Sequence, residues 1–248
     1  MRRRVTTGDK EQMGDYTKMS AYYDTIMTSG YYDYPAIVDA LLHHADPESI
    51  LEIGCGTGLI LEELVKRRPS TQILGIDLTQ SMLSIASKRL DAFHNIRLSR
   101  QNITELRLDE QYRLAFSYGG VWYFVIDGDK EPFLVSHIVD EAANQRGLEC
   151  LSRAVAPGGT LLLGIQGPHH DYERPISNGM IYSQKIQPLD SGFTKHYYLD
   201  DEDKRVMEQT IHYRTFDFEQ AKSLLRSSGF EYLGRAENHR CFLEFRRI

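Results

Sequence analysis

Cysteine is scarce in this chain of 248 residues. The three cysteines, Cys55, Cys150 and Cys241, lie far apart and show no metal-ligand spacing. Such a sparse, odd set is typical of a reducing compartment and argues against a disulfide-stapled fold. Long apolar runs are also missing, because no segment approaches the roughly 18 apolar residues of a membrane span and no apolar stretch follows the basic N-terminus as in a secretory signal. We therefore expect a cytoplasmic protein without a membrane partner.

Positive charge is in deficit too, since the formal net charge is −6. Proteins that bind nucleic acids usually carry a basic face, whereas the basic cluster near the start of this chain is one run of arginines at positions 2–4. A small-molecule partner is therefore favoured over nucleic acid. Tryptophan is nearly absent, with one residue against 15 tyrosines. Tyrosine suits the wall of a pocket for a polar ligand, although packing at sheet edges is the alternative.

Short apolar runs alternate with helical patterns in the middle of the chain. The expected strands cover residues 49–54, 72–77, 95–102, 112–120 and 160–167, and the expected helices cover residues 58–68, 81–90 and a long stretch from about 121 to the segment "LECLSRAVAPGG". This alternation predicts parallel βαβ units with right-handed crossovers, and therefore a doubly wound α/β sheet. Ligands in such sheets bind at the carboxyl ends of the strands.

The segments before and after this α/β region are expected to belong to the same domain, which covers residues 15–248. Residues 1–14 are polar and are expected to be disordered, and residues 15–45 predict helices. Residues 168–216 predict an inserted antiparallel β-ribbon. A helix is expected from Asp217, with Gln220 in the capping-box position, to Gly229, followed by a closing hairpin that turns at Glu237 and Asn238.

The stretch "EIGCGTG" follows the first predicted strand and is typical of a nucleotide-binding turn. A dinucleotide fingerprint would need its third glycine where this chain has Leu59, which disfavours a nicotinamide oxidoreductase. The glycines allow close approach of the backbone to a ligand, while Glu52 would repel a pyrophosphate and attract a cation. S-adenosylmethionine (SAM), which has a sulfonium and an ammonium but no phosphate, fits better. Asp77, at the end of the second strand, can accept hydrogen bonds from ribose hydroxyls.

Four segments, "ILEIGCGTG", "GIDLTQSML", "RQNITEL" and "LSRAVAPGGTLLL", resemble the successive motifs of the class I SAM-dependent methyltransferase family. The resemblance implies a Rossmann-like, mostly parallel seven-stranded sheet with an antiparallel last strand. It also implies a SAM site composed of Tyr22, Glu52, Gly54, Cys55, Gly56, Asp77, Leu78, Met82, Asn102, Ile103, Tyr118 and Gly119. The family usually has an acidic residue at the position of Asn102, whose side-chain carbonyl can still accept a hydrogen bond from the adenine.

The sequence gives weaker signals for the molecule that accepts the methyl group. "SYGGVWYF" lacks the prolines of the motif found in DNA-base methyltransferases, and the acids of "IDGDK" read as a solvated turn, so no metal site is expected. His169 and His170 follow the fifth strand, and either is a candidate base, although a surface loop is the alternative. Tyr123 is a candidate for stacking on the acceptor or for core packing. The N-terminal helices (15–45) and the β-ribbon (168–216) would form a lid.

The leading hypothesis is an enzyme that transfers a methyl group from SAM to a nitrogen or oxygen of a small molecule, such as an amine, amino acid, sugar or natural product. One alternative is methylation of a macromolecule such as tRNA or protein. Another is a non-catalytic subunit that binds SAM. A homodimer is possible on the sequence alone.

Overall fold

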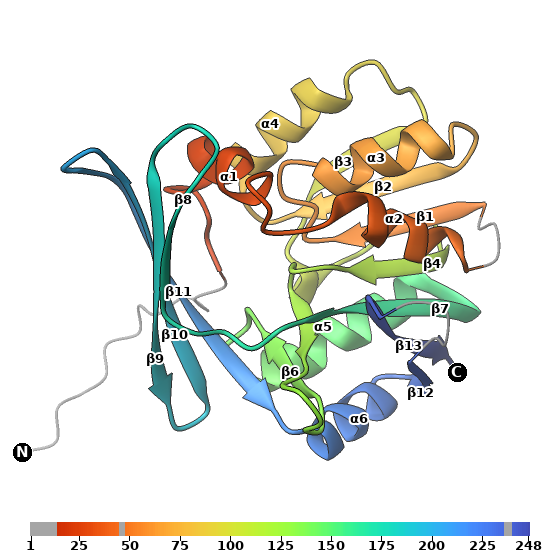
Figure 1. The fold of residues 1–248 in the computed structure, drawn as a ribbon. Helices are drawn as coiled ribbons and strands as arrows, with labels where there is room; N and C mark the ends of the chain where they lie inside the picture. The colour runs from red at the N-terminus through yellow and green to blue at the C-terminus, as the bar shows by residue number, and fades with distance from the viewer. Residues whose placement is uncertain (1–13, 45–47, 236–239) are drawn as a thin grey trace, which may run out of the picture.

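The computed structural model describes residues 14–44, 48–235 and 240–248. Its first sheet has seven strands in the order β3-β2-β1-β4-β7-β13-β12. They are β1 (Ser49–Ile53), β2 (Gln72–Asp77), β3 (Ile96–Arg100), β4 (Tyr112–Ser117), β7 (Val155–Gln166), β12 (Phe230–Arg235) and β13 (Phe242–Arg247). The first five in this order are parallel, and β13 runs antiparallel to both of its neighbours. The predicted mostly parallel sheet with an antiparallel strand is confirmed (Figure 1).

Helices cover both faces of this sheet. They are α2 (Tyr34–Leu42), α3 (Leu59–Arg67), α4 (Gln80–Leu90), α5 (Glu141–Ala154) and α6 (Phe218–Ser227). One apolar core packs α2, α3 and α4 against one face, and another packs α5 and α6 against the other. Each helix buries a stripe of its surface, as the 3.6-residue period requires. The sheet is therefore doubly wound.

A second sheet extends from the end of the first and was only partly predicted. It contains β5 (Trp122–Val125), β6 (Phe133–Ser136), β8 (Tyr172–Pro175), β9 (Ile181–Leu189), β10 (Gly192–Asp201) and β11 (Lys204–Phe216). The end of β7 pairs with β5, and the order continues β6-β11-β10-β9-β8 with antiparallel pairs. We call the strands β8 to β11 the ribbon.

The expected long helix from residue 121 is wrong in its first part. The structure has β5 and β6 there, and α5 begins only at Glu141, after Asp140 caps it by accepting from the Ala143 N–H at 2.7 Å. Both strands are four residues long and almost wholly buried. Such short apolar runs carry no alternation, so periodicity alone does not separate a buried strand from a buried helix.

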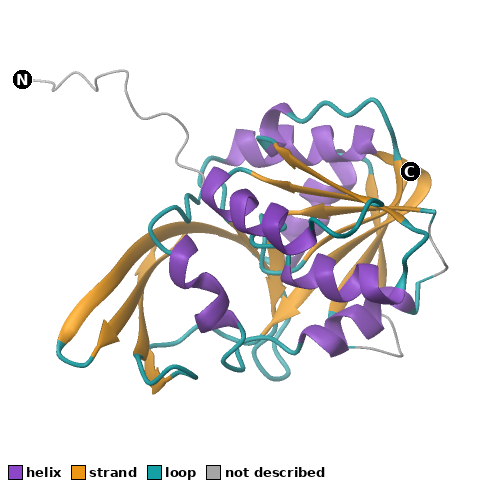
Figure 2. Ribbon diagram, turned by 90° about the horizontal axis from the view of Figure 1, so that it is seen from above, coloured by secondary structure: helices purple, strands orange, loops and turns teal. Residues whose placement is uncertain are grey.

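The flanking segments follow local signals. The capping box at α6 is confirmed, because Asp217 accepts from the Gln220 N–H at 2.8 Å and the Gln220 side chain accepts from the Asp217 N–H at 3.1 Å. The N-terminal helix α1 (Ser20–Met27) packs its apolar side against the concave face of the ribbon (Figure 2). The expectations for a disordered tail and for a turn at Glu237 and Asn238 fall outside the described residues, apart from Gly14. Among the described helices, none combines the length and apolarity that crossing a membrane requires.

Candidate functional site

The glycine-rich turn after β1 is held tightly against the neighbouring strand ends. The backbone N–H groups of Gly54 and Cys55 both donate to the carbonyl of Ile76, at 2.8 and 3.0 Å. Gly54 has a φ of 75°, in the left-handed region that favours glycine, and a Cβ there would lie 2.9 Å from the Cα of Gly120. The turn therefore packs directly on the loop after β4, and the carboxyl ends of β1, β2 and β4 meet at one edge.

Asp77 connects the two strand ends at this edge. Its carboxylate accepts from the Gly56 N–H at 2.8 Å and from the Thr79 N–H at 2.8 Å. Burial raises the pKa of this carboxyl, and the backbone donors act in the opposite direction. A carboxylate at this edge is a charged acceptor of the kind that forms strong hydrogen bonds with the hydroxyls of a ribose.

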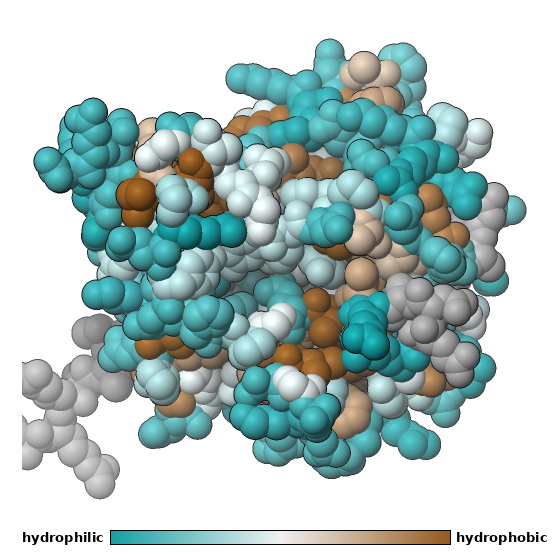
Figure 3. Space-filling view, in the orientation of Figure 1, coloured by the Kyte–Doolittle hydropathy of each residue, from teal (hydrophilic) through white to brown (hydrophobic). Residues whose placement is uncertain are grey.

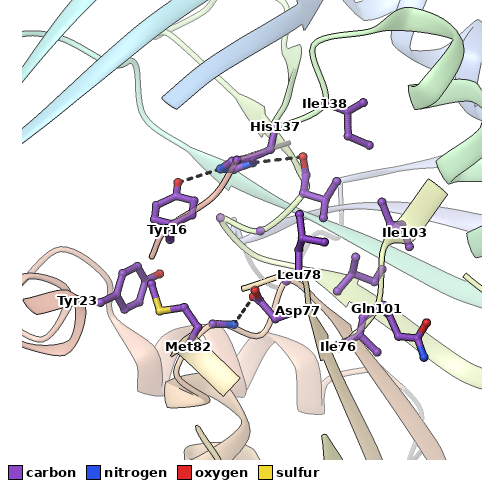
Figure 4. Close-up of a pocket in the computed structure, with 17 residues that line it drawn as sticks. Tyr16, Tyr23, Ile76, Asp77, Leu78, Met82, Gln101, Ile103, His137 and Ile138 are labelled. Carbon is purple, nitrogen blue, oxygen red and sulfur yellow. Dashed lines mark hydrogen bonds between the residues drawn. The ribbon is translucent and has the colours of Figure 1, made fainter. Parts of the chain in front are cut away.

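A cavity of about 680 Å³ opens beside this edge (Figure 4). Of the residues expected to bind SAM, seven lie on its wall: Gly54, Gly56, Asp77, Leu78, Met82, Ile103 and Gly119. Met82, Ile103 and Ile138 are almost fully buried and give one side an apolar surface. Tyr16, Tyr23 and His137 also line the cavity, with the Tyr16 hydroxyl 3.0 Å from His137 Nε2. We call this the cofactor cavity.

The other five residues expected to bind SAM lie off this wall. Glu52 and Cys55 are buried beneath the turn, and Glu52 Oε2 has no hydrogen-bond partner in the described part of the chain. The side-chain carbonyl of Asn102 already accepts hydrogen bonds from the backbone N–H of Thr104 at 3.0 Å and from the Thr104 hydroxyl at 2.9 Å. The neighbouring Gln101 lines the cavity instead. The remaining two are Tyr22, which packs in the core beneath the ribbon, and Tyr118, which packs on Tyr32 with ring centroids 5.2 Å apart.

A second cavity of about 320 Å³ adjoins the first and shares Tyr16, Tyr23, Gly119 and His137 with it. We call it the acceptor cavity. It lies under the ribbon, which contributes Lys195, Tyr197 and Tyr213 to its wall, while α1 and the segment after it contribute Met27, Tyr31 and Tyr32. The remaining wall comes from Tyr123, Gln166 and His169.

Two of the three predicted catalytic residues face the acceptor cavity. The Tyr123 hydroxyl lies 2.9 Å from His169 Nε2, and both side chains line the cavity. His170 is exposed and lines an outer groove between the segment after α1 and β8, where its ring packs on Tyr172. Burial lowers the pKa of His169 to about 3, with nearby Lys195 adding to the shift. His169 is therefore neutral at physiological pH and can accept a hydrogen bond or a proton.

A chain of hydroxyls links the ribbon to the cofactor cavity. The Tyr197 and Tyr213 hydroxyls are 2.6 Å apart, and the Tyr213 and Tyr16 hydroxyls are 3.0 Å apart. Tyr16 in turn contacts His137, whose pKa is lowered to about 4 by burial. Burial raises the pKa of Tyr16 to about 12, so this network is uncharged near neutral pH.

Sequence reasoning missed the most unusual member of the site, Lys195. This side chain is 1% exposed on β10, and its Nζ donates to the Tyr31 hydroxyl at 2.9 Å. Strand alternation was the available signal, because Lys195 shares a face with the buried Phe193 and Tyr197. Tyr16, Tyr31 and His137 were also missed, since no local motif marks them.

The outer groove connects the acceptor cavity to the surface. It shares Tyr31, Tyr32, Gln166 and His169 with that cavity. The space-filling view shows the surface hollowed near the centre of this face, between the ribbon on the left and the first sheet on the right (Figure 3). A small molecule could therefore reach the acceptor cavity without passing through the cofactor cavity.

The residues of the cofactor cavity fit SAM. Asp77 suits the ribose hydroxyls, and the apolar side formed by Leu78, Met82 and Ile103 suits an adenine ring. The aromatic faces of Tyr16 and Tyr23 suit a sulfonium, since aromatic faces attract cations. Among the described residues, no cluster of three or more His, Cys, Asp or Glu side chains could hold a metal ion.

Comparisons with known proteins agree with this architecture. Residues 50–159 match the family model described as a methyltransferase domain. Malonyl-[acyl-carrier protein] O-methyltransferase of Bacillus cereus is 40% identical over 68 residues, which are 27% of this chain and 25% of that protein. The match thus spans about a quarter of the length of this curated relative.

Solved methyltransferases share nearly the whole fold. The SAM-dependent methyltransferase of Clostridium acetobutylicum has a TM-score of 0.68 at 17% identity and covers 94% of this chain and 98% of its own. The sugar N-methyltransferase KedS8 of Streptoalloteichus has a TM-score of 0.70 at 17% identity and covers 100% of this chain and 98% of its own. These solved structures show that the chain shares the fold of SAM-dependent methyltransferases, and residues 50–159 within that fold are similar to a methyltransferase domain.

Proposed function

We propose that this protein is an enzyme that transfers a methyl group from SAM to a nitrogen or oxygen of a small molecule. The observation that carries the proposal is the acceptor cavity, which adjoins the cofactor cavity at Tyr16, Tyr23, Gly119 and His137. A second cavity of this size, reached through a groove, suits a small acceptor better than a segment of tRNA or protein. The named activities of similar proteins, on an acyl-carrier-bound malonyl group and on sugars, also support methyl transfer.

The residues of the chain would act mainly by position. When bound, SAM supplies an electrophilic methyl group on its sulfonium. Tyr16 and Tyr23 line both cavities, so an acceptor in the second would lie next to the cofactor in the first. Aligning the two reactants and excluding water is the main contribution that such a site makes to methyl transfer. The ribbon and α1 would provide the lid that excludes water.

His169 is proposed to accept a hydrogen bond from the N–H or O–H group of the acceptor that is methylated. It is neutral, and Tyr123 holds its Nε2 at 2.9 Å. A pKa of about 3 makes His169 a weak base, so its main effect would be to orient the acceptor's N–H or O–H group by a hydrogen bond. His170 lies outside the cavity and would have no part in the reaction.

Incubation with SAM that carries a deuterated methyl group tests the proposal. The protein is offered a mixture of small amines, amino acids, hydroxy acids and amino sugars, and labelled products are detected by mass spectrometry. Label in a small molecule, lost in the Asp77→Ala variant, is the expected result. Label found only in added tRNA or protein would favour a macromolecular acceptor. SAM binding without any labelled product would favour a non-catalytic subunit.

A further inference from the structure

The described ionisable groups that line the acceptor cavity can supply positive charge but not negative charge. Its described lining contains no Asp or Glu, and Lys195 is the one residue in that lining that can carry a positive charge near neutral pH, where burial lowers its pKa to about 7. His137 and His169 are neutral because burial lowers their pKa values to about 4 and about 3. The tyrosines of the wall keep their protons, because burial raises the pKa of those for which a shift is resolved. The cavity therefore presents a cation and no anion.

Lys195 lacks the partner that a buried ammonium normally has. Within the described ranges, no carboxylate lies within ion-pair distance of its Nζ. Its contacts are the Tyr31 hydroxyl at 2.9 Å and the rings of Tyr197 and Tyr31, whose centroids lie 4.7 and 5.6 Å from Nζ. Burying a charge without an opposite charge is costly, and charged residues are rarely buried fully unless paired. An ammonium has three donors, and one is used by Tyr31.

The surroundings hold Lys195 in place for an external ligand. Its strand neighbours Ile186 and Ile211 flank it in register, and its Nζ lies near the rings of both Tyr31 and Tyr197. Burying this lysine in the wall of the cavity, rather than exposing it to solvent, therefore lowers the stability of the fold. A ligand carboxylate at this point would satisfy the free donors and neutralise the charge, with a strong charge-assisted hydrogen bond.

We propose that Lys195 binds a carboxylate of the methyl acceptor, so that the acceptor is a small carboxylic acid whose carboxylate anchors it for methylation at a nearby nitrogen or oxygen. This inference rests on the proposed function and specifies the class of acceptor. A protonated amine is disfavoured at the same point, because the cavity offers it repulsion from Lys195 and no carboxylate. The amide of the same acid would keep the shape and lose the charge.

Matched pairs of acids and amides test this inference. The probes are 4-hydroxybenzoate with 4-hydroxybenzamide, 4-aminobenzoate with 4-aminobenzamide, and glycine with glycinamide. Their dissociation constants are measured by ligand-observed NMR on the full chain saturated with S-adenosylhomocysteine (SAH), the demethylated product of SAM. We expect at least one acid to bind roughly ten- to a hundredfold more tightly than its amide, the ratio typical of a hydrogen bond to a charged group.

Three variants assign that preference to the lysine. Lys195→Met removes the charge and keeps most of the side chain, so the acid and its amide should then bind with about equal affinity. Lys195→Arg keeps the charge and should retain a preference for the acid. Lys185→Met, on the exposed side of the ribbon, is the matched control and should leave the ratio unchanged. Calorimetry with SAH shows whether each variant retains its cofactor site.

The outcomes separate this inference from the proposed function. If no acid binds more tightly than its amide, or if Lys195→Met keeps the preference, the inference is overturned while SAH binding leaves the methyltransferase proposal standing. If Lys195→Met instead lowers the affinity for SAH, the lysine binds the carboxylate of the cofactor and the acceptor assignment is wrong. If the wild-type protein binds neither SAM nor SAH, the proposed function itself fails.

Discussion

Three residues give the site its chemical character. Asp77 provides a carboxylate at the end of β2, His169 provides a neutral ring in the acceptor cavity, and Lys195 provides a buried cation on the ribbon. Their environments differ: Asp77 lies beside backbone N–H donors, whereas His169 and Lys195 lie among aromatic rings. A substitution at each should therefore change a different measurable property.

Replacing Asp77 with Ala should weaken SAM binding by about 1–3 kcal/mol, because a charged acceptor for the ribose hydroxyls is lost. Isothermal titration calorimetry measures the effect. Asp129→Ala, in the exposed turn after β5, is the control and should bind SAM as the wild type does. Unchanged affinity in Asp77→Ala would remove this residue from the cofactor site.

Replacing His169 with Gln should lower kcat by roughly tenfold, the equivalent of about 1.4 kcal/mol, because the hydrogen bond that orients the acceptor's N–H or O–H group is disturbed. His170→Gln should stay close to the wild type, because that ring lies in the outer groove. Steady-state kinetics with an acceptor identified by deuterium labelling measures both. Equal rates for the two variants and the wild type would end the proposed role of His169.

Replacing Lys195 with Met should make folding stability less dependent on pH. Burial lowers the pKa of Lys195 from 10.5 to about 7, so between these values the unfolded chain binds more protons than the folded one. Wild-type stability, measured relative to the Met variant, should therefore be lowest below pH 7 and should rise up to pH 10.5. Urea unfolding at several pH values tests the sign, and a difference that does not change with pH would show that Lys195 is not desolvated.

At the scale of elements, the site depends on how α1 is attached to the first sheet. Asp24 on α1 accepts from the Thr57 hydroxyl at 2.6 Å and also pairs with Arg89 of α4. Arg89 further donates to the Thr57 carbonyl at 2.9 Å and to Glu62 at 2.7 Å. This network fixes α1, which carries Tyr23, over the glycine-rich turn.

Removing the network should loosen the cover of the cofactor cavity. Arg89→Met breaks both the ion pair to Asp24 and the bond to Thr57. We expect SAH to bind roughly fivefold more weakly, the equivalent of about 1 kcal/mol for a partly exposed ion pair, mainly through faster dissociation. Stopped-flow displacement of SAH measures this, with the exposed Lys88→Met as control. An unchanged dissociation rate in Arg89→Met would mean that α1 does not cover the cofactor.

The elements also show which parts of the fold were predictable. The strands and helices around the glycine-rich turn follow strong signals, such as the strand end at Asp77 and the helix caps, and they were predicted closely. β5 and β6 were not, because four-residue apolar runs buried on both faces have no periodicity. The burial of Lys195 was missed because a lysine is normally exposed, and only pairing between β10 and its neighbours places it inside.

At the scale of the whole molecule, each of the two sheets contributes to a different cavity. The first sheet forms the cofactor cavity at the carboxyl ends of its parallel strands, as expected for a doubly wound sheet. The second sheet and α1 enclose the acceptor cavity, with residues drawn from positions 16 to 213. Local motifs therefore mark seven of the residues that line the cofactor cavity. The acceptor half depends on tertiary packing between distant segments, which no motif records.

Calorimetric titration of the full chain with SAM, SAH and NAD tests the central claim most directly. We expect SAM and SAH to bind at one site per chain and NAD to show no binding, because the glycine-rich turn has Leu59 where a dinucleotide-binding turn needs its third glycine. The same preference should appear in unfolding experiments, where a ligand at 100 times its Kd stabilises a protein by about 2.7 kcal/mol. Binding of NAD without binding of SAM or SAH would contradict the account.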